Sequence, residues 1–187
     1  MGTDKSRLVI GGKTLAQHSA TALSAVAGRV LVVGGRDGDS DGLPVIPDES
    51  ASNGTQYRAS IVGLYTAVKA TQTEWSAVLA CDLPFVTGEL FERLASFIAP
   101  GICAVVPMQA DGRLQPLCAL YRRQVCLPEI EKMLSTGGRK LQDLLHQTET
   151  RIVGIEEIGD LPHSEHFFMN VNTPSDYAAA KAIAGER

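Results

Sequence analysis

The sequence has little of what nucleic-acid-binding and membrane proteins share. Its formal charge is −4 at pH 7, so Lys and Arg are not in excess, whereas proteins that grip a phosphate backbone present a basic face. No apolar run approaches the roughly 18 residues of a membrane span. The opening Met1–Lys5 lacks the apolar core of a secretory signal. We therefore expect a cytoplasmic protein with neither a nucleic-acid nor a membrane partner.

Cysteine and histidine are also scarce, with four of each. The histidines form no HExxH pattern, and the cysteines are too widely spaced for a CxxC metal site. The cysteines lie in apolar, strand-like surroundings, which is typical of small core residues that stay reduced: Cys81, Cys103, Cys118 and Cys126. The sequence thus argues against a zinc site and against a disulfide scaffold.

What the chain does have is the material for one buried core. It has 187 residues, of which 44% are hydrophobic, enough for one domain and short for two. No internal repeat, low-complexity tract or linker divides it. We predict a single domain over residues 1–187.

Helical and strand-like patterns alternate along this domain. Apolar spacing predicts helices over 14–26, 60–70, 89–97, 129–134, 140–146 and 175–184, and strands over 29–33, 44–47, 75–80, 102–107, 115–121 and 151–155. Strands separated by helices form crossover units, which build a mostly parallel sheet covered on both faces. The Asp111-Gly112 turn adds an antiparallel pair. The predicted fold is therefore a Rossmann-like α/β three-layer sandwich with a mixed sheet.

Two aspartates follow short apolar strands in this pattern. Asp82 ends the run 75–80, and Asp48 follows 44–47. Ligands of open α/β sheets bind beyond the carboxyl ends of the strands, and two carboxylates at one edge suit Mg²⁺. Asp82 could instead cap the next helix, although Thr87 is better placed for that. Asp48 could equally be a turn residue.

Other residues gain meaning when the strings around them are read together. The chain resembles the molybdenum cofactor guanylyltransferases, which are MobA-like nucleotidyltransferases, in these strings: Met1-Gly2-Thr3-Asp4-Lys5, Leu8-Val9-Ile10-Gly11-Gly12-Lys13-Thr14-Leu15, Val45-Ile46-Pro47-Asp48, Leu79-Ala80-Cys81-Asp82-Leu83-Pro84-Phe85, Gln115-Pro116-Leu117-Cys118-Ala119-Leu120-Tyr121 and Asn170-Val171-Asn172-Thr173-Pro174. Their order and spacing match over essentially the whole chain.

The resemblance implies an enzyme that transfers GMP from GTP to the phosphate of the molybdenum–molybdopterin cofactor and releases pyrophosphate. It implies Mg²⁺ as cofactor and transient contact with molybdoenzymes or cofactor-delivery proteins. By the same resemblance Lys5 contacts the phosphates, Asp48 the nucleotide, and Asp82 the metal. Taken alone, Lys5 is better explained as a solvated terminal lysine.

The resemblance also places three amides on the acceptor side of the site. Asn170 and Asn172 can donate and accept hydrogen bonds beside phosphate or pterin groups, or they can simply form the turn before Pro174. Gln115 either faces the acceptor pocket or only pairs with the backbone.

The sequence departs from the family pattern at its start. The pattern opens with a central strand and a glycine-rich loop, roughly Leu-Ala-Gly-Gly, ahead of the string at residues 1–5, and neither is present. We expect this to weaken both GTP binding and the fold, because that loop cradles the triphosphate. A misplaced start codon or a trimmed fragment would explain Met1.

A second departure concerns the base and the activity. The string Arg58-Ala59-Ser60-Ile61-Val62-Gly63 replaces a Gly-Pro-Leu-x-Gly stretch and is similar to the cytidylyltransferases of isoprenoid synthesis. Two alternatives therefore stay open. One is the same chemistry with CTP or another acceptor, and the other is a non-catalytic relative that binds a nucleotide or cofactor.

Overall fold

The computed structural model describes residues 5–34, 42–47, 60–138 and 140–186. Its α-helices are α1 (Leu15–Leu23), α2 (Ser60–Ala70), α3 (Gly88–Ala95), α4 (Arg123–Ser135), α5 (Leu141–Gln147) and α6 (Pro174–Ile183). Its strands are β1 (Val9–Ile10), β2 (Lys13–Thr14), β3 (Val32–Val33), β4 (Val45–Ile46), β5 (Trp75–Leu79), β6 (Ala104–Pro107), β7 (Cys118–Arg122) and β8 (Thr150–Val153). Asp48 lies outside the described residues.

The largest sheet has four strands in the order β5-β7-β6-β8. β7 runs antiparallel to both β5 and β6, and β6 runs parallel to β8. Three of the four strands therefore share one direction, and the strand after the Asp111-Gly112 turn opposes them. Gly112 occupies this turn with φ +83°, a conformation that glycine adopts at little cost. The predicted mixed sheet is confirmed.

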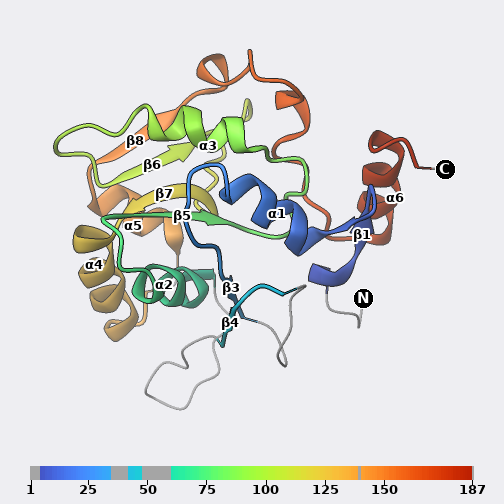
Figure 1. Cartoon of the computed structure of the whole chain (residues 1–187). Coiled ribbons are helices and arrows are strands. Elements are labelled where there is room, and N and C mark those ends of the chain that lie inside the picture. The colour runs from blue at the N-terminus through green and yellow to red at the C-terminus, as the bar shows by residue number, and fades with distance from the viewer. Residues whose placement is uncertain (1–4, 35–41, 48–59, 139, 187) are drawn as a thin grey trace.

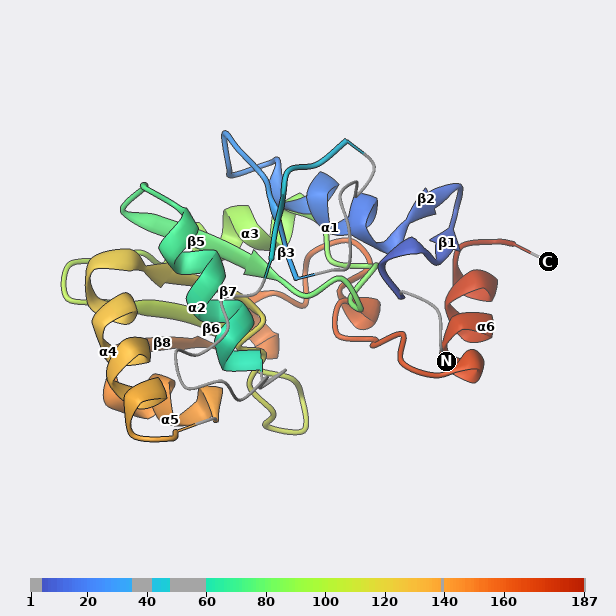
Figure 2. The ribbon, with the colours of Figure 1, turned by 90° about the horizontal axis from the view of Figure 1, so that it is seen from below.

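Helices cover both faces of this sheet, as Figures 1 and 2 show. On one face, Leu23 of α1 and Phe91 of α3 belong to the same buried cluster as Leu120 of β7. On the other face, α2, α4 and α5 pack into a second cluster with Tyr121. Side chains alternate between the two faces of a strand, which is why Leu120 and Tyr121 serve different clusters. The three layers match the predicted sandwich.

A smaller unit joins the two ends of the chain. The hairpin β1–β2 packs beside α6 (Figure 1), and the Tyr177 hydroxyl donates to the Val9 carbonyl over 2.7 Å. Ile10, Leu15 and Val171 are buried together in a third cluster. Residues separated by most of the sequence are thereby brought side by side.

Local signals placed several elements well. α2 spans the predicted 60–70, and Thr14 caps α1 through a capping box with Gln17. The predicted helix over 129–134 starts too late: α4 begins at Arg123 and contains Pro128, although proline disfavours a helix interior. Burial of Cys126, Ile130 and Met133 on one face of α4 offsets that cost.

Thr87 is the N-cap residue of α3, as expected, but its role differs. Its hydroxyl makes no capping hydrogen bond, and within the described residues this buried oxygen has no partner. The position was therefore correct and the mechanism was wrong. Gly88 next to it lies so close to Ala25 that a side chain does not fit.

Two further expectations concern cysteine and charge. Cys103, Cys118 and Cys126 are buried, Cys81 is half-buried, and the four form no disulfide. Burial raises the pKa of the Cys126 thiol to about 12, so this residue is an inert part of the core.

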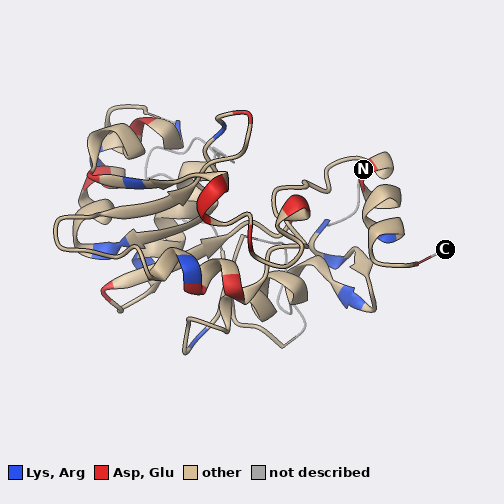
Figure 3. Ribbon diagram, turned by 90° about the horizontal axis from the view of Figure 1, so that it is seen from above, with Lys and Arg blue, Asp and Glu red and all other residues tan. Residues whose placement is uncertain are grey.

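Lys and Arg are scattered over many elements (Figure 3). Among the described residues, no helix is both long and apolar enough to span a membrane.

The contact between α1 and α3 yields a stability prediction. A Cβ atom on Gly88 would lie 2.5 Å from the Ala25 Cβ, so we expect Gly88→Ala to lower the free energy of unfolding by about 1–3 kcal/mol through overpacking. Urea denaturation measures this change. Gly28→Ala is the matched control because nothing lies within 4 Å of its added Cβ. Equal stability of the two variants would show that α1 and α3 adjust freely.

Candidate functional site

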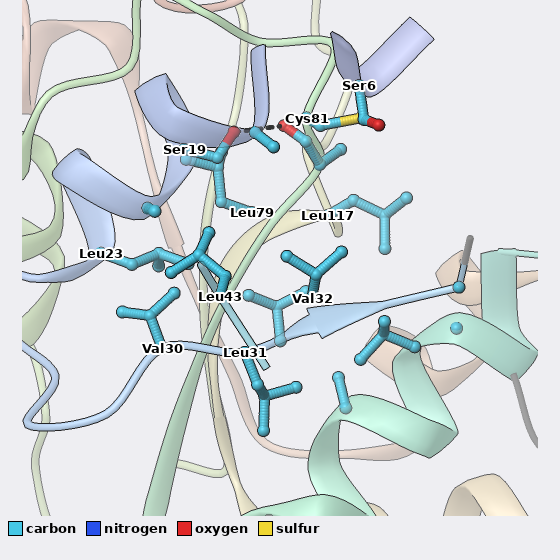
Figure 4. A pocket seen from close by; sticks show the side chains of 18 of the residues that line it. Ser6, Ser19, Leu23, Val30, Leu31, Val32, Leu43, Leu79, Cys81 and Leu117 are labelled. Carbon is cyan, nitrogen blue, oxygen red and sulfur yellow. Dashed lines mark hydrogen bonds between the residues drawn. The ribbon is translucent and has the colours of Figure 1, made fainter. Parts of the chain in front are cut away.

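A cavity of about 510 Å³ lies between β3 and β5. α1 contributes Ala16 and Ser19 to one wall, and α2 contributes Gly63 and Ala67 to the opposite wall. Figure 4 shows the side chains of Val30, Leu31, Val32, Leu43 and Leu79 among those that line the cavity. These side chains make the interior apolar.

Polar side chains gather at one end of the cavity. Lys5, Asp82 and Asn172 all line it, and Lys5 Nζ donates a hydrogen bond to Asn172 Oδ1 over 3.1 Å. The Asn172 side chain also hydrogen-bonds the Asp82 carboxylate, and the charge of Lys5 acts on the same carboxylate. Three residues predicted from separate strings thus form one cluster, which we call the Lys5–Asp82–Asn172 cluster.

Asp82 owes its position to the end of β5. The carbonyl of Asp82 accepts a hydrogen bond from the Val171 N–H over 2.9 Å, which joins the strand end to the segment that carries Asn172. The next residue, Leu83, is 2% exposed and anchors the turn in the core. Burial raises the pKa of the Asp82 carboxyl, although its own backbone, Lys5 and Asn172 all oppose that shift.

The backbone of Asn172 is held by the start of α6. Asp176 accepts from the N–H groups of Asn172 and Thr173 at 3.0 and 2.8 Å. In return Thr173 Oγ1 accepts from the Asp176 N–H over 3.1 Å, which completes a capping box. These backbone hydrogen bonds lower the pKa of Asp176. The turn interpretation of Asn172 therefore fits the structure, and its role beside the acceptor stays a prediction.

Two other predicted residues lie apart from this cluster. Asn170 Nδ2 donates to the Phe168 carbonyl over 3.4 Å, and the Gln115 N–H donates to the Pro107 carbonyl over 2.9 Å. Neither is among the residues that line the cavity. The structure leaves their acceptor role as a prediction, and Asp48 falls outside the described residues.

The structure adds two cations that the sequence analysis missed. Arg7 and Arg29 line the same cavity as Lys5, and Asp82 is the acid among the described lining residues. This excess of positive charge favours an anionic ligand. Arg7 follows Lys5 by two residues in the 3-10 helix Lys5–Arg7, a proximity that could have identified it. Arg29 had no comparable signal.

The cluster also offers oxygen ligands for a divalent cation. Mg²⁺ is usually held by one or two carboxylates together with substrate phosphates and water. The Asp82 carboxylate suits that mode, whereas the Asn172 amide oxygen accepts the hydrogen bond from Lys5 Nζ. The described residues contain no group of three or more His, Cys, Asp or Glu that would form an all-protein metal site. The donor set therefore fits a cation that arrives with a phosphate ligand.

The buried Asp82 carboxylate yields a pH prediction. Because burial raises its folded pKa, ionised Asp82 opposes folding, and we expect Asp82→Asn to be at least as stable as the wild type at pH 7. As the pH falls through the folded pKa, the native carboxyl gains a proton before the unfolded chain does, so the wild type gains stability. The variant's advantage should vanish below about pH 4, the ordinary pKa of aspartate.

Urea denaturation of both proteins between neutral and acid pH measures this difference. Asp143→Asn, at an exposed position of α5, is the matched control. A less stable Asp82→Asn protein at pH 7 would mean that attraction to Lys5 outweighs burial.

Comparison with known proteins places the chain. Residues 1–152 match the model of the MobA-like NTP transferase domain. A probable molybdenum cofactor guanylyltransferase of Pelotomaculum thermopropionicum is 32% identical over 98% of this chain and 87% of its own length. One of Carboxydothermus hydrogenoformans is 30% identical over 95% of this chain and 86% of its own length.

Solved structures share the fold. Molybdopterin-guanine dinucleotide biosynthesis protein A of Archaeoglobus fulgidus superposes with a TM-score of 0.70 at 22% identity, over 98% of this chain and 92% of that one. The 2-C-methyl-D-erythritol 4-phosphate cytidylyltransferase of Thermus thermophilus superposes with a TM-score of 0.71 at 18% identity, over 98% of this chain and 95% of that one. These likenesses establish the fold, and the sequence matches establish the family. The chain belongs to the MobA-like NTP transferase family.

Proposed function

We propose that this chain transfers GMP from GTP to the terminal phosphate of molybdenum–molybdopterin and releases pyrophosphate. The observation that carries the proposal is the Lys5–Asp82–Asn172 cluster at the polar end of a cavity whose described lining has more cations than acids. The relatives from Carboxydothermus hydrogenoformans and Pelotomaculum thermopropionicum are named as probable molybdenum cofactor guanylyltransferases, which supports GTP and the molybdenum cofactor as the substrates.

The proposed reaction needs no nucleophile from the protein. An oxygen of the molybdopterin phosphate attacks the α-phosphorus of GTP, a new P–O bond forms, and the bond from the α-phosphorus to the bridging oxygen breaks. Pyrophosphate takes the electron pair. Such transfers depend on in-line positioning and on neutralising charge at the phosphoryl oxygens.

The residues of the cluster divide this work. Lys5 supplies a positive charge for the phosphates, and Asn172 orients its ammonium group through the 3.1 Å hydrogen bond. The Asp82 carboxylate would hold Mg²⁺, which neutralises phosphate charge when bound. Asp48 remains the proposed contact to the nucleotide, and Gln115 and Asn170 the proposed acceptor contacts. We place the activity in the cytoplasm, with transient contacts to molybdoenzymes or delivery proteins.

CTP is the one alternative to GTP as the nucleotide of the proposed reaction. The cytidylyltransferase of Thermus thermophilus shares the fold to the same degree as the Archaeoglobus fulgidus protein, so the fold does not select between GTP and CTP. The sequence relatives favour GTP.

Product analysis tests the reaction directly. The full chain is incubated with molybdenum cofactor, Mg²⁺ and one of GTP, CTP, ATP or UTP, and mass spectrometry identifies the dinucleotide while a coupled assay follows pyrophosphate. We expect the guanine product with GTP. A cytosine dinucleotide formed with CTP would show that the enzyme uses CTP and not GTP. If GTP raises the melting temperature of the protein but no pyrophosphate is released, the chain binds the nucleotide without catalysing the transfer.

Substitutions in the cluster test the division of work. We expect Asp82→Asn to lower kcat by roughly 100-fold or more because metal-assisted charge neutralisation is lost. Lys5→Ala should mainly raise the KM for GTP. Asp111→Asn serves as the control because Asp111 pairs with Arg113 at an exposed turn. Normal turnover of Asp82→Asn would remove the metal assignment.

A further inference from the structure

Asn172 contributes to the site from an exposed position in the chain. Its side chain accepts a hydrogen bond from Lys5 Nζ over 3.1 Å and hydrogen-bonds the Asp82 carboxylate, although the residue itself is exposed. At exposed positions water competes for such hydrogen bonds, so each contributes little net free energy. Fixing the side chain in one rotamer also costs conformational entropy. The geometry of this end of the cavity therefore depends on how firmly the backbone of Asn172 is held.

Two consecutive N–H groups hold that backbone on two different elements. The Val171 N–H donates to the Asp82 carbonyl over 2.9 Å, which ties the segment to the end of β5. The Asn172 N–H donates to Asp176 Oδ2 over 3.0 Å, which ties it to the first turn of α6. The Asn172 side chain leaves the chain between these two ties. Asp176 is therefore one of the two residues that fix where this side chain starts.

The hydrogen bond from Asn172 goes beyond what the start of the helix requires. In a capping box the side chain of the fourth residue accepts from the N–H of the N-cap residue, and here Asp176 Oδ2 accepts from the N-cap Thr173 over 2.8 Å. The same oxygen accepts in addition from Asn172, one residue before the cap. That second bond adds nothing to the box and instead fixes the residue whose side chain meets Lys5. It is the observation that carries the inference.

The charges near Lys5 support the same role. The backbone N–H groups of Thr173 and Asn172 lower the pKa of the Asp176 carboxyl, and the positive charge of Lys5 adds to that shift. Asp176 is therefore ionised at neutral pH. Lys5 also acts on the Asp82 carboxyl, so its ammonium group lies in the field of two carboxylates. Both carboxylates attract the ammonium group before any phosphate arrives.

We propose that Asp176 is a positioning residue for phosphate binding: by fixing the Asn172 backbone, it holds Lys5 where the triphosphate needs its charge. Asp176 acts through Asn172 and Lys5 and is assigned no contact with a substrate. Without the Oδ2 acceptor, Lys5 loses the partner that orients it, and ordering its ammonium group then costs entropy at the moment of binding. This inference rests on the proposed function, because the triphosphate is the ligand that Lys5 is proposed to bind.

Three substitutions separate this role from helix capping. Asp176→Ala removes the acceptor for both N–H groups. Asp176→Asn keeps one carbonyl oxygen, which is enough because both N–H groups use the same oxygen. Thr173→Val removes the other half of the capping box, the acceptor for the Asp176 N–H, and leaves the Asp176 oxygen in place. Asp176→Ala and Thr173→Val should therefore weaken the start of α6 alike, and only Asp176→Ala frees Asn172.

Amide hydrogen exchange of the full chain measures the backbone without any substrate. We expect the Asn172 N–H to exchange roughly tenfold faster in Asp176→Ala than in Thr173→Val, because only the former loses its acceptor. The Tyr177 N–H, which donates to the Thr173 carbonyl over 3.0 Å, reports the loss of the cap and should change equally in both variants.

Steady-state kinetics with GTP, Mg²⁺ and molybdenum cofactor measure the effect on the reaction. We expect Asp176→Ala to raise the KM for GTP roughly fivefold or more and Thr173→Val to leave it within about twofold, because lost ground-state binding appears in KM. A merely structural role would lower the amount of folded enzyme, and so the apparent kcat, without moving KM. Asp176→Asn should keep the wild-type KM or lower it, since it keeps the acceptor and removes a negative charge near the triphosphate.

The effect should also pass through Lys5. In a Lys5→Ala background, Asp176→Ala should raise the KM for GTP further by less than about twofold, because residues that act as one unit are not additive. A full additional increase in that background would show that Asp176 acts by another route and would overturn the proposal.

Two other results would also overturn it. Equal KM values, or equal Asn172 exchange, in Asp176→Ala and Thr173→Val would show that Asp176 serves only the helix. An Asp176→Asn enzyme with a KM as high as that of Asp176→Ala would show that the charge matters and the hydrogen bonds do not. If the wild type forms no dinucleotide, the proposed function fails, whereas amide exchange still decides whether Asp176 holds Asn172.

Discussion

The pairing of β5 with β7 is the constraint on which both the site and the cavity depend. The five-residue register from Trp75–Arg122 to Leu79–Cys118 fixes where β5 ends, and thereby where Asp82 emerges. One antiparallel ladder thus decides where a carboxylate stands at the end of the strand.

The cluster at the end of β5 also depends on contacts between distant parts of the chain. Lys5 and Asn172 come from opposite ends of the sequence, and the packing of the β1–β2 hairpin against α6 brings them together. The hydrogen bond from Val171 to the Asp82 carbonyl then ties that unit to the sheet. A change in the packing of Ile10, Leu15 or Val171 would therefore shift the Lys5–Asp82–Asn172 cluster without altering any of its three side chains.

The sequence predicted well those structural features that depend only on residues close together in the chain. The apolar spacing of 60–70 and the Thr14 capping box are properties of single segments, and both appear in the structure. The strings around Lys5, Asp82 and Asn172 likewise indicated a common site. The start of α4 could not be predicted, because burial of its face overrides the local effect of Pro128. Arg29 could not be found either, because its place in the lining of the cavity arises only from tertiary packing.

The small side chains that line the cavity place stability and ligand binding in opposition. Replacing Gly63 or Ala67 with a larger apolar residue would add buried contacts between α2 and the strands, and such changes often raise the thermal stability of natural proteins. Here the added contacts would occupy the space that a ligand needs. Selection for robustness alone would therefore close the cavity.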